Sequence, residues 1–73
     1  MPHSTAHVHV ARTVRKLRLK MKLSQERLAE LAGLHTNTVR RLESVKYDPA
    51  LSTLLKLARA LKVRPAVLLK DIR

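Results

Sequence analysis

The chain has 73 residues, of which sixteen are lysine or arginine and five are aspartate or glutamate, so its formal net charge is +11 at pH 7. This length leaves room for one domain with a small core, and with one tyrosine and no phenylalanine or tryptophan, aliphatic side chains must fill that core. The absence of cysteine excludes disulfides, and without a long apolar run or a secretion signal we expect a cytoplasmic location and no membrane partner.

The excess of positive charge favours an anionic partner. Nucleic acid is the first candidate, and an acidic membrane surface is the second. A third interpretation is a basic protein whose lysines and arginines only cover a solvated face. The position of the charges relative to the apolar residues decides among the three.

Residues 1–7 show no apolar periodicity, and we expect them to form a flexible arm in front of a single domain of residues 8–73. Three histidines lie in or beside this arm, at His3, His7 and His9. His7 and His9 would not share a helix face, and no cysteine or nearby carboxylate completes a coordination shell. We therefore predict no metal site and no cofactor.

An amphipathic helix is predicted from about Val8 to Leu23. Apolar residues recur at steps of three and four from Val10 to Met21, as one buried helix face requires. The lysines and arginines lie off that stripe, a pattern also typical of helices on anionic membranes. This segment has no aromatic anchor, and the apolar stripes that follow give it partners to pack against.

Two short helices are predicted on either side of Gly33, the only glycine of the chain. Ser24 can cap the first of them, and Gly33 supplies the left-handed backbone on which a helix can end. The second runs through TNTVRRLE, with Val39 and Leu42 facing inward. Two helices joined by a short turn with glycine form the unit that enters the DNA major groove. The buried side of the first helix is predicted to comprise Leu28, Ala29, Leu31 and Ala32.

Another apolar stripe follows Pro49, and a break near Pro65 separates it from a last helix. Asp48 and Pro49 are predicted to begin the first of these helices, as its cap and first residue. A domain this small does not need every apolar residue of this region in its core, so some apolar surface should stay exposed. We predict a two-fold homodimer contact formed by Leu55, Val67, Leu69 and Ile72.

The chain is predicted to be all-α and not an enzyme. Three prolines and one glycine leave little turn chemistry for strands, and no long segment alternates apolar and polar residues. The carboxylates are scattered, no serine has a spacing that ties it to a histidine and an acid, and no glycine-rich phosphate loop is present. A binding module is expected.

From Val14 to about Leu69 the chain resembles the DNA-binding domain of the Cro and lambda-repressor type, the XRE family. The resemblance lies in VRKLR of the first helix, LSQERLAELAGL through the turn, TVRRLE after it, and DP followed by LSTLLKLARALKV. It implies a five-helix lambda-repressor-like domain that contains a helix-turn-helix and binds double-stranded DNA.

The resemblance implies structural and phosphate-binding roles for matching positions. Arg18 is expected to pair with Glu43 and tie the first helix to the end of the second helix of the turn. Gln25 is expected to brace that helix and to contact a phosphate. Further phosphate contacts, which set affinity rather than sequence choice, are implied for Ser24, Ser44, Lys46 and Tyr47.

The second helix of the turn, around residues 36–43, is the recognition helix of the family. Base contacts are implied for Thr36, Asn37, Arg40 and Arg41. Residue chemistry agrees, because arginine can bond two acceptors of guanine, asparagine can do the same to adenine, and threonine can offer a methyl to thymine. Arg41 is favoured over Arg40 as a base contact. For Arg40, a contact with a base and a contact with a phosphate both stay open. The alternative for Thr36 and Asn37 is that they only cap the helix.

The chain departs from the family at three turns. Lys22, Val45 and Lys62 stand where relatives commonly have glycine, and valine is a poor residue for a left-handed backbone. We therefore expect the loop after Glu43 to take another shape, which weakens the phosphate assignments beside it.

These features predict a sequence-specific transcription regulator, either a repressor or an autoregulator. As a homodimer it would place two recognition helices in the major groove of a palindromic operator. The alternative is an antitoxin, in which the same fold also binds a partner toxin. A basic membrane-surface peptide is the third class, and the turn at Gly33 argues against it.

Overall fold

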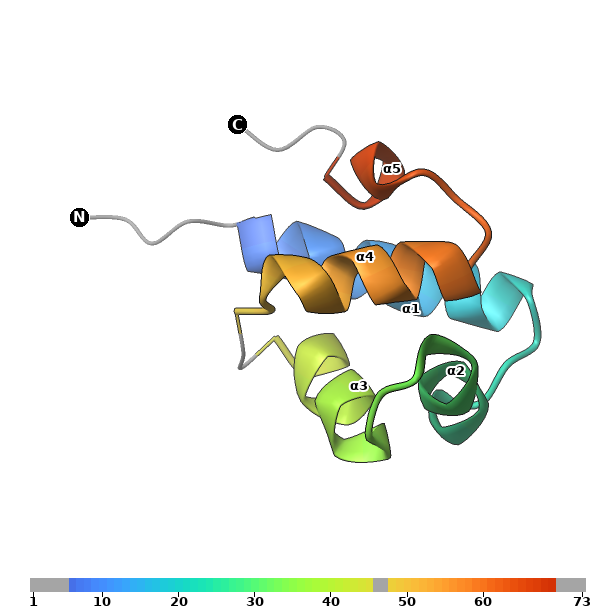
Figure 1. Cartoon of the computed structure of the whole chain (residues 1–73). Coiled ribbons are helices and arrows are strands. Elements are labelled where there is room, and N and C mark those ends of the chain that lie inside the picture. Colours follow the sequence, from blue (N-terminus) through green and yellow to red (C-terminus); the bar gives the residue numbers. More distant parts are fainter. Residues whose placement is uncertain (1–5, 46–47, 70–73) are drawn as a thin grey trace.

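The computed structural model describes residues 6–45 and 48–69, and this part of the chain is built from helices alone (Figure 1). The prediction of an all-α domain with five helices is thereby confirmed. No helix in the described ranges is long and apolar enough to cross a membrane. The helices are α1 (Ala6–Lys20), α2 (Gln25–Ala32), α3 (Thr36–Glu43), α4 (Leu51–Ala60) and α5 (Pro65–Leu69).

The helices surround one core, with α5 on the side opposite α2 and α3 (Figure 1). α2 and α3 pack on each other, α3 also packs on α1, and α2 on α4. α5 covers α1 and α4. The paired helices α2 and α3 therefore form one end of the molecule, supported from behind by the two longest helices.

Aliphatic residues from all five helices fill this core, as the composition predicts. Small residues such as Ala29 and Ala58 are also fully buried, and they let neighbouring helices approach closely. The largest side chains that are withdrawn from solvent are Val14, Leu28, Val39, Leu42, Leu57 and Leu68.

Leu31 is an exception to the predicted core, because 46% of its surface is exposed. α2 makes little more than two turns, and Leu28, Ala29 and Ala32 already form its buried stripe. Leu31 lies roughly 100° from the centre of that stripe, so it points to solvent. The prediction that Leu31 is buried is wrong.

Two helices begin at other residues than predicted. α1 starts at Ala6, so Ala6 and His7 belong to the helix rather than to the expected arm, whose residues 1–5 lie outside the described part. α4 starts at Leu51, after an extended Ala50 with φ −68° and ψ 154° that provides no side-chain cap. Because Ala50 is still extended and the helix begins only after it, the predicted start at Asp48 and Pro49 is wrong.

Four helices end on a residue with a left-handed backbone, and only one of these residues is glycine. After α2, the Leu34 N–H donates to the Ala29 carbonyl at 2.8 Å. The N–H groups of Leu23 and Val63 make the equivalent bonds at 3.0 Å after α1 and α4. The left-handed residues are Lys22 (φ 59°), Gly33 (φ 70°), Val45 (φ 62°) and Lys62 (φ 59°). α1 thus ends at Lys20, three residues before the predicted Leu23.

The expectation that Val45 diverts the loop after α3 is wrong at this residue. Val45 keeps the left-handed backbone, and its N–H closes the helix by donating to the Leu42 carbonyl at 3.3 Å. Leu42 is fully buried, so packing fixes the end of α3 whatever residue follows it. The conformation costs a residue with a Cβ atom about 1–2 kcal/mol, and the fold bears this cost.

Replacing Val45 with glycine should therefore stabilise the protein. We expect Val45→Gly to raise the free energy of unfolding by about 1 kcal/mol, since it removes the strain but makes the unfolded chain more flexible. The melting temperature should rise by roughly 4–8 °C in thermal unfolding followed by circular dichroism.

Gly33→Ala is the matched control. A Cβ atom at Gly33 would meet nothing within 4 Å, so only the backbone conformation (φ 70°) opposes alanine. This variant should lose about 1 kcal/mol. A Val45→Gly protein that melts at or below the parent temperature would contradict the strain argument.

Candidate nucleic-acid interface

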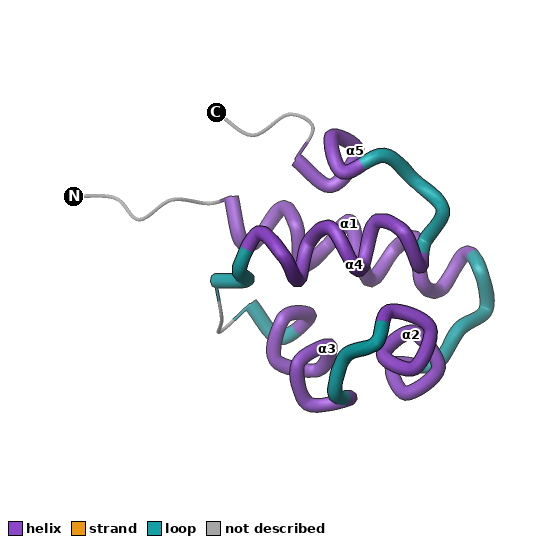
Figure 2. Tube along the Cα trace, viewed as in Figure 1, coloured by secondary structure: helices purple, strands orange, loops and turns teal. Residues whose placement is uncertain are grey.

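Local chemistry sets the start and the end of α2. The Ser24 side-chain oxygen accepts a hydrogen bond from the Arg27 backbone N–H at 2.9 Å, which satisfies one of the free donors of the first turn. Gly33 ends the helix with φ 70° and ψ 35°. Figure 2 shows the short loop of residues 33–35 that leads from α2 to α3. The cap at Ser24 and the hinge at Gly33, both predicted, are confirmed.

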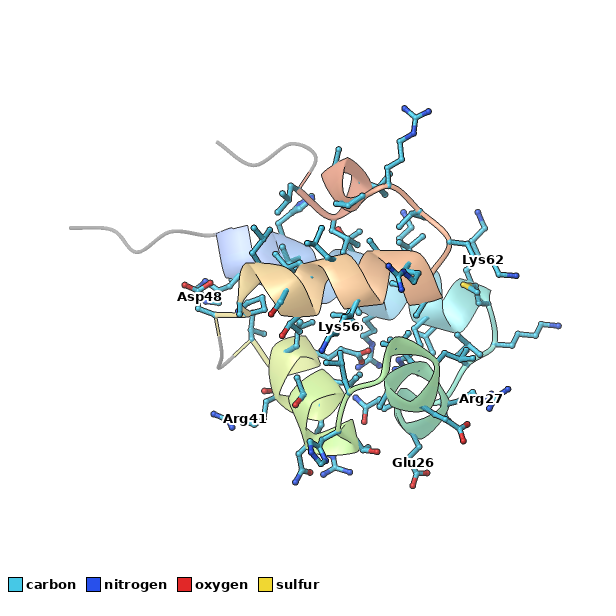
Figure 3. All side chains as sticks on the ribbon, viewed as in Figure 1. Glu26, Arg27, Arg41, Asp48, Lys56 and Lys62 are labelled. Carbon is cyan, nitrogen blue, oxygen red and sulfur yellow. The ribbon has the colours of Figure 1, made fainter. Side chains whose placement is uncertain are left out.

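Burial of Val39 and Leu42 sets the rotation of α3 about its axis. With these two residues in the core, Asn37, Arg40 and Arg41 lie on the exposed side of the helix, and Thr36 is half-buried. In Figure 3 the Arg41 side chain extends from α3 away from the other helices. α3 begins after His35, whose side chain makes no capping hydrogen bond.

Two of the residues expected to read bases contact each other. Arg40 Nη1 donates a hydrogen bond to Asn37 Oδ1 at 2.5 Å, one helical turn away. The positions of the Asn37 and Arg40 side chains are therefore not independent of each other.

A buried ion pair ties the end of α3 to α1. Arg18 Nε donates to Glu43 Oε2 at 2.7 Å, and Nη2 donates to Oε1 at 3.0 Å. The two side chains are only 9% and 2% exposed. Arg18 Nη1 also donates to the Leu23 carbonyl oxygen at 2.7 Å, which holds the segment just before α2. The pair that the resemblance implied is present, with two-pronged geometry.

Gln25 extends this network to the first residue of α2. Its Nε2 donates to Glu43 Oε1 at 3.1 Å, so the glutamine braces the recognition helix as expected. Within the described ranges, no buried side-chain nitrogen or oxygen lacks a hydrogen-bond partner. Phosphate contact by Gln25 stays a prediction.

The hydrogen bond to Glu43 raises the pKa of Arg18 above its ordinary value, although burial acts in the opposite direction. A raised pKa means that the titration of Arg18 itself costs the fold nothing below the unfolded pKa, and that the contribution of this group is lost only as the pH rises through the folded one. The guanidinium therefore stays charged in all but strongly alkaline solution.

The other expected phosphate contacts lie at the two ends of the helix pair. Ser24 is exposed at the start of α2, and the exposed Ser44 donates from its hydroxyl to the Arg41 carbonyl oxygen at 2.7 Å. Lys46 and Tyr47 lie outside the described residues. Both serines thus already take part in helix ends, and their roles toward DNA stay predictions.

Three of the four expected dimer residues are exposed on two helices that pack together, α4 and α5. Leu55, Val67 and Leu69 are among the large exposed apolar residues, and Ile72 lies outside the described part. Leu51, which is 66% exposed, is not among the residues predicted for the dimer contact. Its spacing of four residues from Leu55 places both on one face of α4, and this spacing was the available signal.

Breaking the buried ion pair on one side should destabilise the fold strongly. Glu43→Ala leaves the Arg18 guanidinium buried without its partner, and we expect it to lower the free energy of unfolding by about 3–5 kcal/mol. The double change Arg18→Met with Glu43→Leu removes both charges and should lose much less. Urea unfolding measures all three proteins.

Arg27→Ala is the matched control, since Arg27 pairs with Glu30 on the exposed surface of α2. Exposed pairs contribute roughly 0.2–1 kcal/mol, so this variant should stay close to the parent. The argument fails if Glu43→Ala is no more damaging than Arg27→Ala.

Comparison with known proteins agrees with this geometry. A family model described as helix-turn-helix (HTH_3) matches residues 14–68. The control protein C.SmaI of Serratia marcescens is 44% identical over 52 residues, which are 71% of this chain and 62% of that protein. The match thus spans less than two thirds of the length of this relative.

Solved structures give the same fold. The restriction-modification controller protein C.AhdI from Aeromonas hydrophila is 39% identical with a TM-score of 0.81, over 85% of this chain and 94% of that one. The P22 c2 repressor, solved with a synthetic operator, is 30% identical with a TM-score of 0.77, over 84% of this chain and 92% of that one. The chain therefore belongs to the HTH_3 helix-turn-helix family, a family of DNA-binding transcription regulators rather than enzymes.

Proposed function

We propose that this protein is a homodimeric, sequence-specific repressor or autoregulator that inserts α3 into the major groove of each half of a palindromic operator. The exposed face of α3 is the observation that carries this proposal. Its side chains, Thr36, Asn37, Arg40 and Arg41, have the hydrogen-bonding chemistry of base readers. α3 itself is held by its buried residues and by the ion pair at its end.

Positive charge supports binding to the DNA backbone. The net charge of +11 attracts phosphates whatever the DNA sequence, whereas contacts at specific positions fix the register of the protein on the duplex. Ser24 and Gln25 stand at the start of α2, where backbone N–H groups favour an anion, and Ser44 stands at the end of α3. Phosphates bound at these two positions, one on each side of the groove, would hold α3 between them.

Exposed apolar side chains support the homodimer. Leu51 and Leu55 on α4, and Val67 and Leu69 on α5, are large residues left in water by the single chain. A second copy would cover them by the two-fold symmetry that palindromic operators match, with recognition helices about 34 Å apart. An antitoxin would instead use this apolar surface for a toxin, and the two partners would compete for it.

The C.AhdI relative supports a proposal about the regulated system. That protein is a restriction-modification controller, and it is similar to this chain over 94% of its length. A restriction-modification locus is therefore the favoured target. As an autoregulator, the protein would bind the DNA upstream of its own gene.

Selection of bound duplexes from a random DNA pool tests the reading function. We expect a palindromic motif, and we expect Arg41→Ala to change its preferred bases. The affinity should fall with salt at a log-log slope of about 0.9 for each phosphate neutralised. Arg59→Ala, which removes an exposed cation of α4 outside the helix-turn-helix, should leave the motif unchanged. Recovery of the same sequences by the parent and by Arg41→Ala would contradict base reading by Arg41.

Sedimentation tests the dimer. Leu55→Glu places a charge in the proposed contact, so we expect a monomer at micromolar concentration where the parent is a dimer. Leu31→Glu is the matched control, because Leu31 and Leu55 are both 46% exposed but lie on different helices. A parent protein that is monomeric at high micromolar concentration, with and without DNA, would overturn the dimer. A stoichiometric protein that follows the chain through high salt from its native host would support the antitoxin.

A further inference from the structure

The hydrogen bond between Asn37 and Arg40 bears on which bases α3 selects. Arg40 Nη1 donates to Asn37 Oδ1 at 2.5 Å. Both residues are exposed, and their spacing of three places them one turn apart on the same side of α3. They are two of the four residues expected to read bases, and the contact between them implies a different role in DNA binding for each.

The atoms in this contact are fixed by chemistry. An arginine guanidinium has five N–H donors and no acceptor, so the Asn37 atom that faces it is the carboxamide oxygen. The carboxamide nitrogen of Asn37 has two N–H donors, and Arg40 keeps those donors that the contact does not use. The pair therefore offers the major groove mainly donors, beside one positive charge.

Donors suit guanine better than adenine. Guanine presents two acceptors in the major groove, N7 and O6, whereas adenine presents the N7 acceptor and the N6 amino donor. Two-pronged adenine reading by Asn37 needs the same oxygen that Arg40 already engages. The adenine amino group would then lie beside the donors of a cation. Guanine meets no such conflict, because both of its groove acceptors can receive N–H groups of Arg40.

The contact also holds Arg40 before DNA arrives. A free arginine side chain has many rotamers, and freezing them on binding weakens the complex. A guanidinium already bonded to Asn37 loses less of this freedom. Asn37 can therefore strengthen a base contact that it does not make itself.

We propose that Asn37 and Arg40 act as one unit that selects guanine, in which Arg40 bonds the base and Asn37 positions the guanidinium. This rests on the proposed function, that α3 reads the major groove, and it deepens that function. It replaces the expectation that Asn37 reads adenine. It also gives Arg40 a base of its own, in addition to the base expected for Arg41.

A double-mutant cycle on selected DNA tests the unit. A random duplex pool is bound by the parent, Asn37→Ala, Arg40→Ala and the double variant, and affinities are then measured on the selected duplex and on one with 7-deazaguanine in place of each guanine. Arg40→Ala should lower the preference at one guanine per half-site by roughly 5- to 150-fold. Asn37→Ala should lower the preference at that same guanine by roughly 2- to 12-fold. The double variant should lose no more than Arg40→Ala alone.

Two further variants separate positioning from other effects. Asn37→Asp keeps an oxygen for Arg40 and should retain the guanine preference, although its charge weakens binding to all sequences. Arg41→Ala, on the same helix, should change another base position and leave this guanine preferred. Circular dichroism should show the parent fold in all variants, because both residues of the unit are exposed.

Independent losses would overturn the inference. If Asn37→Ala abolishes a preference for adenine, both alone and in the Arg40→Ala background, Asn37 reads a base directly. If the losses of guanine preference caused by Asn37→Ala and Arg40→Ala multiply in the double variant, the two residues do not act as a unit. Either result leaves the proposed function standing, whereas a parent protein that selects no common sequence from the pool overturns the proposed function and the inference with it.

Discussion

The buried Arg18 guanidinium connects both outer ends of the helix-turn-helix to α1. It donates to Glu43 at the end of α3 and to the Leu23 carbonyl just before α2. Gln25, the first residue of α2, donates to the same Glu43 carboxylate. One charged group thus ties the segment before α2 and the last residue of α3 to the same point on α1. The hinge at Gly33 lies between these two anchored ends, and the exposed side chains of α3 keep a defined direction.

Apolar packing alone would not fix α3 in this way. Val39 and Leu42 set its rotation, but aliphatic contacts tolerate some sliding along the helix axis because they have no direction. The hydrogen bonds of Glu43 have direction, and an unpaired charge in their place is costly. A buried pair is weak evidence for stability, since matched apolar residues can be as stable. Its contribution here is the position of α3, on which the proposed base reading depends.

The parts predicted from sequence are those with local causes. Ser24 caps and Gly33 ends a helix through atoms within a few residues of each, so the chain itself shows them. Arg18 and Glu43 are 25 residues apart, and only the resemblance to a family indicated their contact. The exposure of Leu31 does not follow from its sequence, because the apolar stripe of a short helix does not show which of its two flanks a neighbouring helix covers. The left-handed Val45 shows tertiary packing overriding local preference.

The two lysines that follow helix ends in a left-handed conformation affect both the stability of the fold and its attraction to DNA. Lys22 and Lys62 adopt the left-handed backbone that glycine adopts without strain, and both are exposed just after the ends of α1 and α4. A cation there interacts favourably with the negative end of the helix dipole, by about 0.3–1 kcal/mol, which offsets part of the backbone strain. Val45 has no charge to provide this offset. The same lysines also contribute to the net charge that draws the protein to phosphate. Glycine at these two positions would relieve strain but supply neither the helix-end interaction nor the charge.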